Sequence, residues 1–177
     1  MPERTVSSVR AYTGRLLALR VDEVALASGR HATREVVEHP GAVAILAWDG
    51  AQLAMVRQWR QAAGSELLEI PAGTAEANET RLATAQRELA EECDLRASGW
   101  EEGPSFYTAP GFCTEFLTVF LATDLSPMEV AAPEDEVLER SWLPLTDAVA
   151  AVEDGRIRDA KSIVGILWLA QRGAAPA

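Results

Sequence analysis

The sequence contains few of the residues that mark secreted, membrane-spanning or nucleic-acid-binding proteins. Only two of its 177 residues are cysteines, too few for a disulfide framework, which predicts a reducing cytoplasm. The longest apolar runs, from Ala42 and from Ile163, are far shorter than the roughly 20 residues of a membrane helix. The N-terminus has no apolar core of signal-peptide length. Sixteen basic against 27 acidic residues give a net charge of −11, which argues against nucleic acid as a partner.

The acidic balance also limits the small molecules that the protein can bind. An anionic substrate would be repelled unless metal ions and a few local arginines reverse the field at its site. The length predicts one domain with a proper hydrophobic core, and 48% hydrophobic residues fit a soluble globular protein. A divalent cation is therefore a requirement for any anionic substrate.

The most informative stretch is Gly73–Leu95, which reads GTAEANETRLATAQRELAEECDL. Its apolar residues recur at three- and four-residue steps, as on one face of a helix; they are Leu82, Ala85, Leu89 and Cys93. Glu88, Glu91 and Glu92 project from neighbouring positions beside that stripe. Like charges at this spacing repel, so the cluster indicates either a solvated acidic face or a site for Mg²⁺ or Mn²⁺, which prefer oxygen ligands.

The offsets in this stretch resemble the Nudix box, a pattern of glycine, glutamate, Arg-Glu and Glu-Glu at fixed spacing. The matching residues are Gly73, Glu79, Arg87, Glu88, Glu91 and Glu92, with Leu89 and Leu95 at the aliphatic positions. One position departs, because Asp94 stands where the family has a second glycine. Asp tolerates the left-handed conformation of a helix end less well than glycine. Arg87 cannot bind a metal, and we expect it to pair with Glu79 and hold the loop against the helix.

The rest of the chain alternates between strand and helix patterns. We expect a helix from about Asn78, as the cap, to Cys93, and a tight hairpin at Asp49-Gly50. Strands are expected at residues 16–22, 32–39, 42–48, 52–58, 67–70, 100–107, 116–123 and 140–143, and further helices at 145–153 and 159–172. This mixed α/β (α+β) pattern agrees with the α/β/α sandwich with a mixed sheet that the Nudix resemblance implies. We predict an N-terminal antiparallel strand layer in residues 1–40, a catalytic domain in 41–172 and a disordered tail in 173–177.

Outer segments resemble the ADP-ribose pyrophosphatase subfamily more specifically. Residues 66–73, ELLEIPAG, resemble its lead-in to the box, and residues 107–115, YTAPGFCTE, resemble its Pro-Gly-Phe loop. Residues 55–60, MVRQWR, and residues 155–162, GRIRDAKS, resemble two further segments of that subfamily. The resemblance covers roughly Val43 to Leu169.

The resemblance also implies roles for individual residues. The metal ligands would be the Ala72 carbonyl, Glu88, Glu92 and Glu136, with Glu91 acting directly or through water. Glu134 would be the catalytic base, with Glu136 as the alternative, and Glu91 and Arg87 complete the expected catalytic set. The alternative interpretation of the loop that carries Glu134 and Glu136 is a solvated acidic turn without a catalytic role.

Six further residues are candidates for contact with the substrate. Arg57 and Arg60 suit the phosphates, although Arg57 also fits the solvent face of an edge strand. Glu69 and Glu115 are candidates to accept hydrogen bonds from ribose hydroxyls. Trp59 and Phe112 offer flat surfaces for adenine, although an aromatic residue in a strand is more often part of a core.

The function implied by the resemblance is hydrolysis of the diphosphate bond of ADP-ribose to AMP and ribose 5-phosphate with two or three Mg²⁺ (or Mn²⁺) ions. The alternatives are hydrolysis of another nucleoside diphosphate derivative, such as GDP-mannose, NADH or FAD, or a module that senses ADP-ribose without cleaving it. The subfamily also implies a homodimer formed through the N-terminal strand layer, with Arg57 or Trp59 near the partner's nucleotide. We expect no nucleic acid and no membrane as partners.

Overall fold

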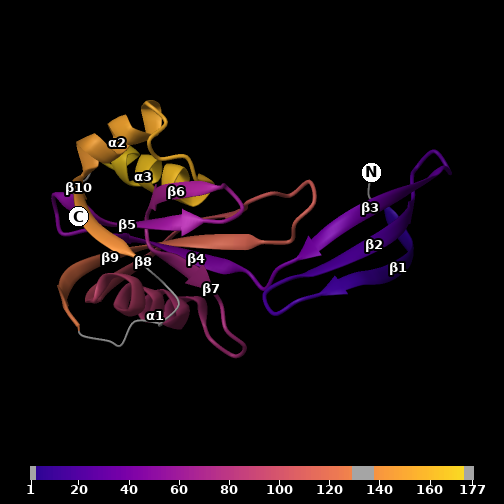
Figure 1. Cartoon of the computed structure of the whole chain (residues 1–177), viewed down its shortest axis with the longest axis horizontal. Coiled ribbons are helices and arrows are strands. Elements are labelled where there is room, and N and C mark those ends of the chain that lie inside the picture. The colour runs from indigo at the N-terminus through magenta and orange to yellow at the C-terminus, as the bar shows by residue number, and fades with distance from the viewer. Residues whose placement is uncertain (1–2, 129–137, 174–177) are drawn as a thin grey trace. The chain divides into compact units, whose positions relative to one another are not determined.

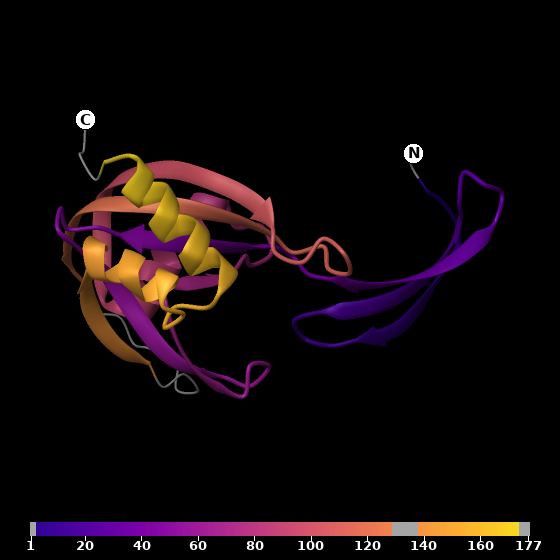
Figure 2. The same cartoon turned by 90° about the horizontal axis from the view of Figure 1, so that it is seen from above.

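A computed structural model gives the structure of residues 3–128 and 138–173. The chain forms two compact units. One contains Met1–Gly41 and Tyr107–Phe116, and the other contains Ala42–Phe106 and Leu117–Ala177. Figures 1 and 2 show both from two directions, with the N-terminal strands in indigo and the C-terminal helices in orange and yellow.

The first unit is built on a three-stranded antiparallel sheet in the order β1-β2-β3, which confirms the predicted antiparallel layer. Its strands are β1 (Arg4–Thr13), β2 (Ala18–Ala25) and β3 (His31–Glu38). The sequence analysis did not predict β1. Every side chain of this strand is exposed, so no buried face imposes an alternation of apolar and polar residues. Pairing with β2 holds it as a strand.

The segment Tyr107–Phe116 packs on β3 within the same unit. The Val37 amide donates to the Phe112 carbonyl (2.7 Å), and the Thr114 amide donates to the Val37 carbonyl (2.9 Å). The rings of Tyr107 and Phe116 meet edge to face with centroids 5.0 Å apart, an arrangement that aromatic pairs favour. The loop that resembles the Pro-Gly-Phe motif is therefore anchored to the N-terminal strands.

Two sheets form the strand framework of the second unit. The first has the order β7-β4-β9-β8, with β4 (Ala42–Ala47) parallel to β9 (Phe116–Pro127) and antiparallel to β7 (Ala72–Thr74). The other strand of that sheet is β8 (Leu95–Tyr107). The second sheet has the order β10-β5-β6, all antiparallel, with β5 (Gln52–Arg60), β6 (Ser65–Glu69) and β10 (Glu139–Pro144).

Both faces of β4 are buried, because its alternate residues enter two separate cores. Ala44 and Leu46 pack in the larger core with α2 (Leu145–Glu153) and α3 (Ala160–Gln171). Val43 and Ile45 pack in the smaller core with Ala85 and Leu89 of α1 (Arg81–Cys93). Figure 1 shows α1 on one side of this sheet and the α2–α3 pair on the other. The α/β/α sandwich with a mixed sheet is therefore confirmed, and the unbroken apolar run of β4 is explained.

Three local expectations differ from the structure. The helix is capped by Thr80, whose hydroxyl accepts from the Ala83 amide, whereas Asn78 has a left-handed backbone (φ 70°). Asp49-Gly50 does form a turn, but β4 and β5 enter different sheets after a single bridge from Trp48 to Leu53. They separate because β7 and β9 already pair with both edges of β4. Leu82, expected on the buried stripe of α1, is instead exposed.

Cys93 lies where the apolar stripe of α1 meets the smaller core. Burial raises the pKa of its thiol to about 12, so it is a packing residue and not a nucleophile. In the part of the chain that the structure describes, no helix is both long enough and apolar enough to cross a membrane.

Candidate active site

The guanidinium of Arg87 joins the loop before α1 to the acidic face of the helix. Its Nε and Nη2 donate to the two carboxylate oxygens of Glu79, at 3.1 and 3.2 Å, as the sequence analysis expected. Its Nη1 donates to Glu88 (2.7 Å) and to Glu91 (2.9 Å), and Nη2 also reaches the Thr74 carbonyl. The hydrogen bond from Arg87 keeps the pKa of Glu79 below its ordinary value. A single cation thus holds three carboxylates and β7 together.

Gly73 allows the Glu88 carboxylate to lie directly against the β7 backbone. A Cβ atom built on Gly73 would lie 1.9 Å from the carboxyl carbon and from Oε1 of Glu88. A side chain at position 73 would displace that carboxylate, so this glycine is explained by close approach and not by an unusual backbone conformation.

Glu92 turns toward the same strand from the last turn of α1. It is only 4% exposed, and its Oε2 accepts a hydrogen bond of 2.8 Å from the Ala72 amide. The Ile45 amide donates to the Pro71 carbonyl, one residue earlier in the chain. The segment before the Nudix box and the end of α1 therefore support each other, which collects Glu88 and Glu92 around Ala72 and Gly73.

A second charged cluster surrounds Glu69, at the end of β6. This side chain is 1% exposed. It accepts from Nε and Nη2 of Arg60, at 2.8 and 2.6 Å, and from Nζ of Lys161 at 2.5 Å. Lys161 also contacts Asp159 at 2.8 Å. Burial opposes ionisation of Glu69, but these cations outweigh it, and the pKa of Glu69 lies below its ordinary value.

This site geometry coincides with two family matches. Residues 38–164 match the NUDIX domain, and residues 3–37 match the nucleoside diphosphate sugar hydrolase N-terminal domain. The chain belongs to the Nudix family. This Nudix hydrolase is 39% identical over 172 residues to the ADP-ribose pyrophosphatase of Bacillus subtilis, covering 96% of this chain and 93% of the relative. It is 43% identical over 169 residues to the ADP-ribose pyrophosphatase of Mycobacterium tuberculosis, covering 92% of this chain and 81% of the relative.

The fold is also that of a known structure. A solved ADP compounds hydrolase superimposes with a TM-score of 0.87, covering 99% of this chain and 98% of that one. The sequence identity is 21%, so this likeness establishes the fold alone.

The donor set on α1 suits the divalent ions that Nudix hydrolases generally use. Carboxylate and carbonyl oxygens are the ligands that Mg²⁺ and Mn²⁺ prefer. Within residues 3–128 and 138–173, no group of three or more His, Cys, Asp or Glu side chains is arranged as a ready-made metal site. The positive Nη1 of Arg87 lies between Glu88 and Glu91 instead. Glu88 and Glu91 thus share one positive charge in this structure, and their role as metal ligands stays a prediction.

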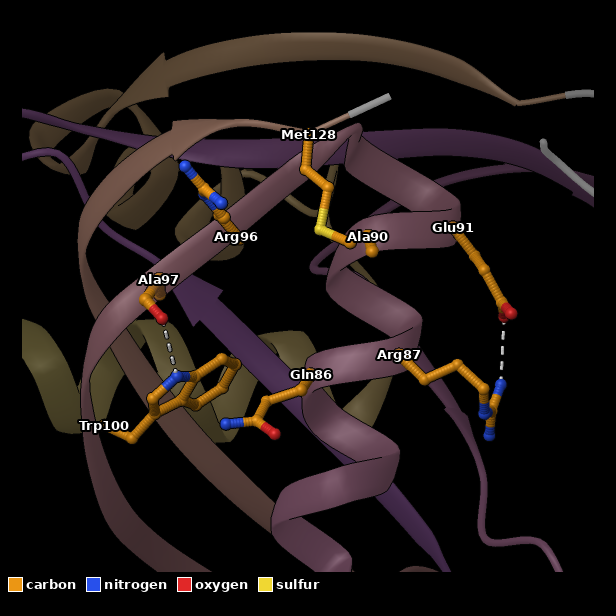
Figure 3. A pocket seen from close by; sticks show the side chains of 8 residues that line it. All are labelled: Gln86, Arg87, Ala90, Glu91, Arg96, Ala97, Trp100 and Met128. Atoms are coloured by element: carbon orange, nitrogen blue, oxygen red, sulfur yellow. Dashed lines mark hydrogen bonds and ion pairs between the residues drawn. The ribbon is translucent and has the colours of Figure 1, made fainter. Parts of the chain in front are cut away.

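A pocket of about 370 Å³ lies between α1 and the first part of β8. Its lining residues are Gln86, Arg87, Ala90, Glu91, Arg96, Ala97, Trp100 and Met128 (Figure 3). In this view Arg87 and Glu91 point toward each other, and the indole of Trp100 donates to the Ala97 carbonyl. Glu91 thus borders an open hollow, whereas Glu92 is buried.

The predicted substrate residues of β5 do not share one face of the strand. Arg57 and Trp59 are exposed, with Arg57 3.8 Å from Glu139 and the Trp59 indole donating to Gln61. Arg60 turns the other way, toward Glu69. The strand β5 is central in its sheet, so Arg57 lies on a solvent face but not on an edge strand.

Glu69 was predicted to bind ribose. Its oxygens contact Arg60 and Lys161, and the contact with ribose stays a prediction. The sequence analysis missed Lys161 as a member of the site. Lys161 lies in the segment 155–162, which was noted as similar to the subfamily. No residue of that segment was assigned to the site.

The remaining candidates lie outside the second unit or outside the described residues. In the first unit, Phe112 is exposed, and Glu115 accepts from the Thr108 hydroxyl at 2.5 Å and lies 3.7 Å from His39. Glu134 and Glu136 lie outside the described residues. Their roles, like those of the other site residues, stay predictions.

Replacing Glu69 by glutamine is expected to destabilise the protein by about 3 kcal/mol at pH 7, because it leaves the partly buried Lys161 and Arg60 without their shared anion. The pKa of Glu69 is lower in the folded protein than in the unfolded chain. The ionised carboxylate therefore stabilises the fold above the unfolded-chain pKa of about 4.3, and this stabilisation is lost as the pH falls through the folded-state pKa. Urea unfolding should therefore show a gap between wild type and variant at pH 7 that shrinks toward pH 3.

Glu66→Gln is the matched control for this prediction, because Glu66 lies on the same strand and is exposed. It should change the free energy of unfolding by less than about 0.5 kcal/mol. A Glu69→Gln variant as stable as wild type at pH 7 would contradict the assignment of Glu69 as the anchor of both cations.

Proposed function

We propose that this Nudix hydrolase cleaves the diphosphate bond of ADP-ribose to give AMP and ribose 5-phosphate. The observation that carries the proposal is the packing of the α1 carboxylates against Ala72 and Gly73, with Glu92 bonded to the Ala72 amide. The substrate is supported by two relatives named ADP-ribose pyrophosphatase that match over more than nine-tenths of this chain. The match of residues 3–37 to the N-terminal domain of nucleoside diphosphate sugar hydrolases supports it further.

We infer that two or three Mg²⁺ or Mn²⁺ ions bind the Ala72 carbonyl, Glu88 and Glu92, with Glu91 directly or through water. Glu136 is a further proposed ligand. When bound, these ions supply the charge that neutralises diphosphate oxygens and acidifies water.

The chain's own residues then divide the remaining work. Arg87 orients Glu88 and Glu91 by holding both from one nitrogen. Arg60, fixed by Glu69, is positioned to bind a phosphate oxygen through its guanidinium. Glu134, or Glu136 as the alternative, removes a proton from the water molecule. This water attacks phosphorus in line with the leaving phosphate. The proposed order is therefore binding by arginine, orientation by α1 and proton removal by an acidic residue of the segment 134–136.

The test is to incubate the protein with Mg²⁺ and ADP-ribose, GDP-mannose, NADH and FAD in parallel and to identify the products by chromatography. ADP-ribose should give AMP and ribose 5-phosphate with a kcat/KM at least ~10-fold above the other compounds, a margin worth about 1.4 kcal/mol in transition-state binding. Running the reaction in ¹⁸O-labelled water identifies the phosphorus that is attacked. Turnover of GDP-mannose with none of ADP-ribose would replace this proposal by its alternative.

We also propose that the enzyme is a cytoplasmic homodimer, with residues 1–40 as the dimerisation element and 41–172 as the catalytic domain. Both cysteines are free, in keeping with a reducing compartment. The N-terminal layer exposes several large apolar side chains, namely Val6, Val9, Tyr12, Leu16 and Leu17. Large apolar side chains exposed on one small layer favour an interface there.

Sedimentation velocity at micromolar concentration should give twice the mass of one chain. Val9 is 64% exposed, so Val9→Lys should leave the fold intact while introducing an unpaired charge into the interface, and the species should shift toward monomer. Ala150→Lys, at an exposed position on α2 of the second unit, is the comparison and should leave the mass unchanged. A wild-type monomer at this concentration would contradict the dimer.

A further inference from the structure

The C-terminal end of α1 contains an ion pair where the Nudix box has a glycine. Asp94 occupies the left-handed region (φ 54°, ψ 37°), and its amide closes the helix on the Ala90 carbonyl at 3.0 Å. A residue with a Cβ pays a steric cost there that glycine avoids. The left-handed conformation at the end of α1 is therefore kept in this chain by Asp94 in place of glycine.

Arg140, at the start of β10, binds this helix end with all three of its guanidinium nitrogens. Nη1 contacts the Asp94 carboxylate at 2.5 Å. Nε donates to the Glu92 carbonyl at 2.6 Å, and Nη2 donates to the Glu91 carbonyl at 3.2 Å. The last carbonyls of a helix have no partner within it and carry partial negative charge. A planar guanidinium satisfies two of them and the carboxylate together, which a lysine cannot do.

The two carbonyls belong to residues whose side chains form the acidic site. The Glu91 side chain contacts Arg87, and the Glu92 side chain reaches the Ala72 amide. Both residues lie in the final turn, where helices fray. Holding the backbone of Glu91 and Glu92 in place also holds the origin of both side chains. Arg140 does this from β10, a different element of the fold.

We propose that Arg140 is a positioning residue for the carboxylates of Glu91 and Glu92, and that Asp94 and Arg140 together replace the helix-ending glycine of the Nudix box. This inference rests on the proposed function only in taking those carboxylates as metal ligands. In this proposal Arg140 acts through the helix backbone and not as a metal ligand. Its effect is carried by the helix end, so its loss should weaken metal binding and not only stability.

The experiment compares Arg140→Met, Arg140→Lys and Asp94→Gly with wild type in two measurements. The first is the Mg²⁺ concentration that gives half-maximal rate at saturating ADP-ribose. The second is the affinity for Mn²⁺ without substrate, followed by the electron paramagnetic resonance of the free ion. Thermal unfolding is recorded for every variant, so that a loss of stability is separated from a loss of metal affinity.

Arg140→Met should raise the Mg²⁺ requirement and weaken Mn²⁺ binding by about 10-fold, the lower end of the range for residues that support metal ligands. Arg140→Lys should fall between this variant and wild type, because it keeps the charge but loses the fork. Asp94→Gly should stay within about 3-fold of wild type, since glycine adopts the left-handed conformation freely and both carbonyl contacts of Arg140 remain.

Arg156→Met is the matched control, because Arg156 is an exposed arginine paired with Asp154 at 2.8 Å on the loop after α2. It should leave both metal measurements unchanged. Mn²⁺ affinity within 2-fold of wild type in Arg140→Met would overturn the inference, and Arg140→Lys decides in its place if the methionine variant does not fold. A wild type that binds Mn²⁺ but does not hydrolyse ADP-ribose would contradict the proposed function alone.

Discussion

Glu92→Gln is expected to reduce kcat by at least ~10²-fold while the protein stays folded, because the change removes the charge of a proposed metal ligand at nearly constant shape. Glu92 is buried, and its Oε2 accepts from the Ala72 amide. The glutamine oxygen can accept the same hydrogen bond, so the contact between α1 and the segment before β7 is kept. Steady-state kinetics with ADP-ribose and Mg²⁺, together with thermal unfolding, measure the two effects separately.

The comparison for this variant is Glu102→Gln, the same change at an exposed glutamate of β8. Its kcat should stay within about 2-fold of wild type, since surface substitutions change little. Excess Mg²⁺ should recover only part of the lost rate in Glu92→Gln, because a missing ligand lowers both metal affinity and the charge at the site. An unchanged kcat would remove α1 from the mechanism.

The acidic helix was predictable because its signal is local. The offsets from Gly73 to Glu92 lie within one short stretch of sequence, and periodicity alone places the glutamates of its helix beside an apolar stripe. The pairing of Arg87 with Glu79 followed from the same short stretch, and the structure has it. The mixture of strands and helices likewise predicted a sheet covered on both faces.

Long-range partners were not predictable from one sequence. Lys161 lies 92 residues after Glu69, and Arg140 lies 48 residues after Glu92. No periodicity or local motif links residues at such separations, so the contact of Glu69 with Lys161 was not predicted. Asp94 was recognised as a departure from the box, but its compensation by Arg140 required the fold.

Short and exposed strands were missed for a related reason. The strand β7 has only three residues, Ala72 to Thr74, and is defined by pairing with β4. The strand β1 has no buried residue and is defined by pairing with β2. In both, hydrogen bonds to a neighbour decide the conformation, and side-chain pattern carries little of the signal.

Gly73→Ala is expected to abolish most of the activity while costing little stability. The added Cβ would lie 1.9 Å from the Glu88 carboxyl carbon, so one of the two must move. The end of a glutamate side chain rotates far more easily than a strand backbone shifts, and Gly73 does not have a positive φ. Glu88 should therefore turn away from Ala72 and Gly73, and kcat should fall by at least ~10²-fold as a metal ligand is displaced.

A double-mutant cycle with Glu88→Ala tests whether the lost activity comes through that carboxylate. Glu88→Ala removes the clashing atoms together with the proposed ligand. If the alanine at position 73 acts by displacing Glu88, adding it to Glu88→Ala should lower kcat by less than about 2-fold, a strong departure from additivity. The unfolding free energy of Gly73→Ala should change by less than about 1 kcal/mol, since alanine restricts the unfolded chain more than glycine does. Independent, additive losses would instead mean that the β7 backbone has moved, and the close approach of Gly73 and Glu88 would not be what places the carboxylate.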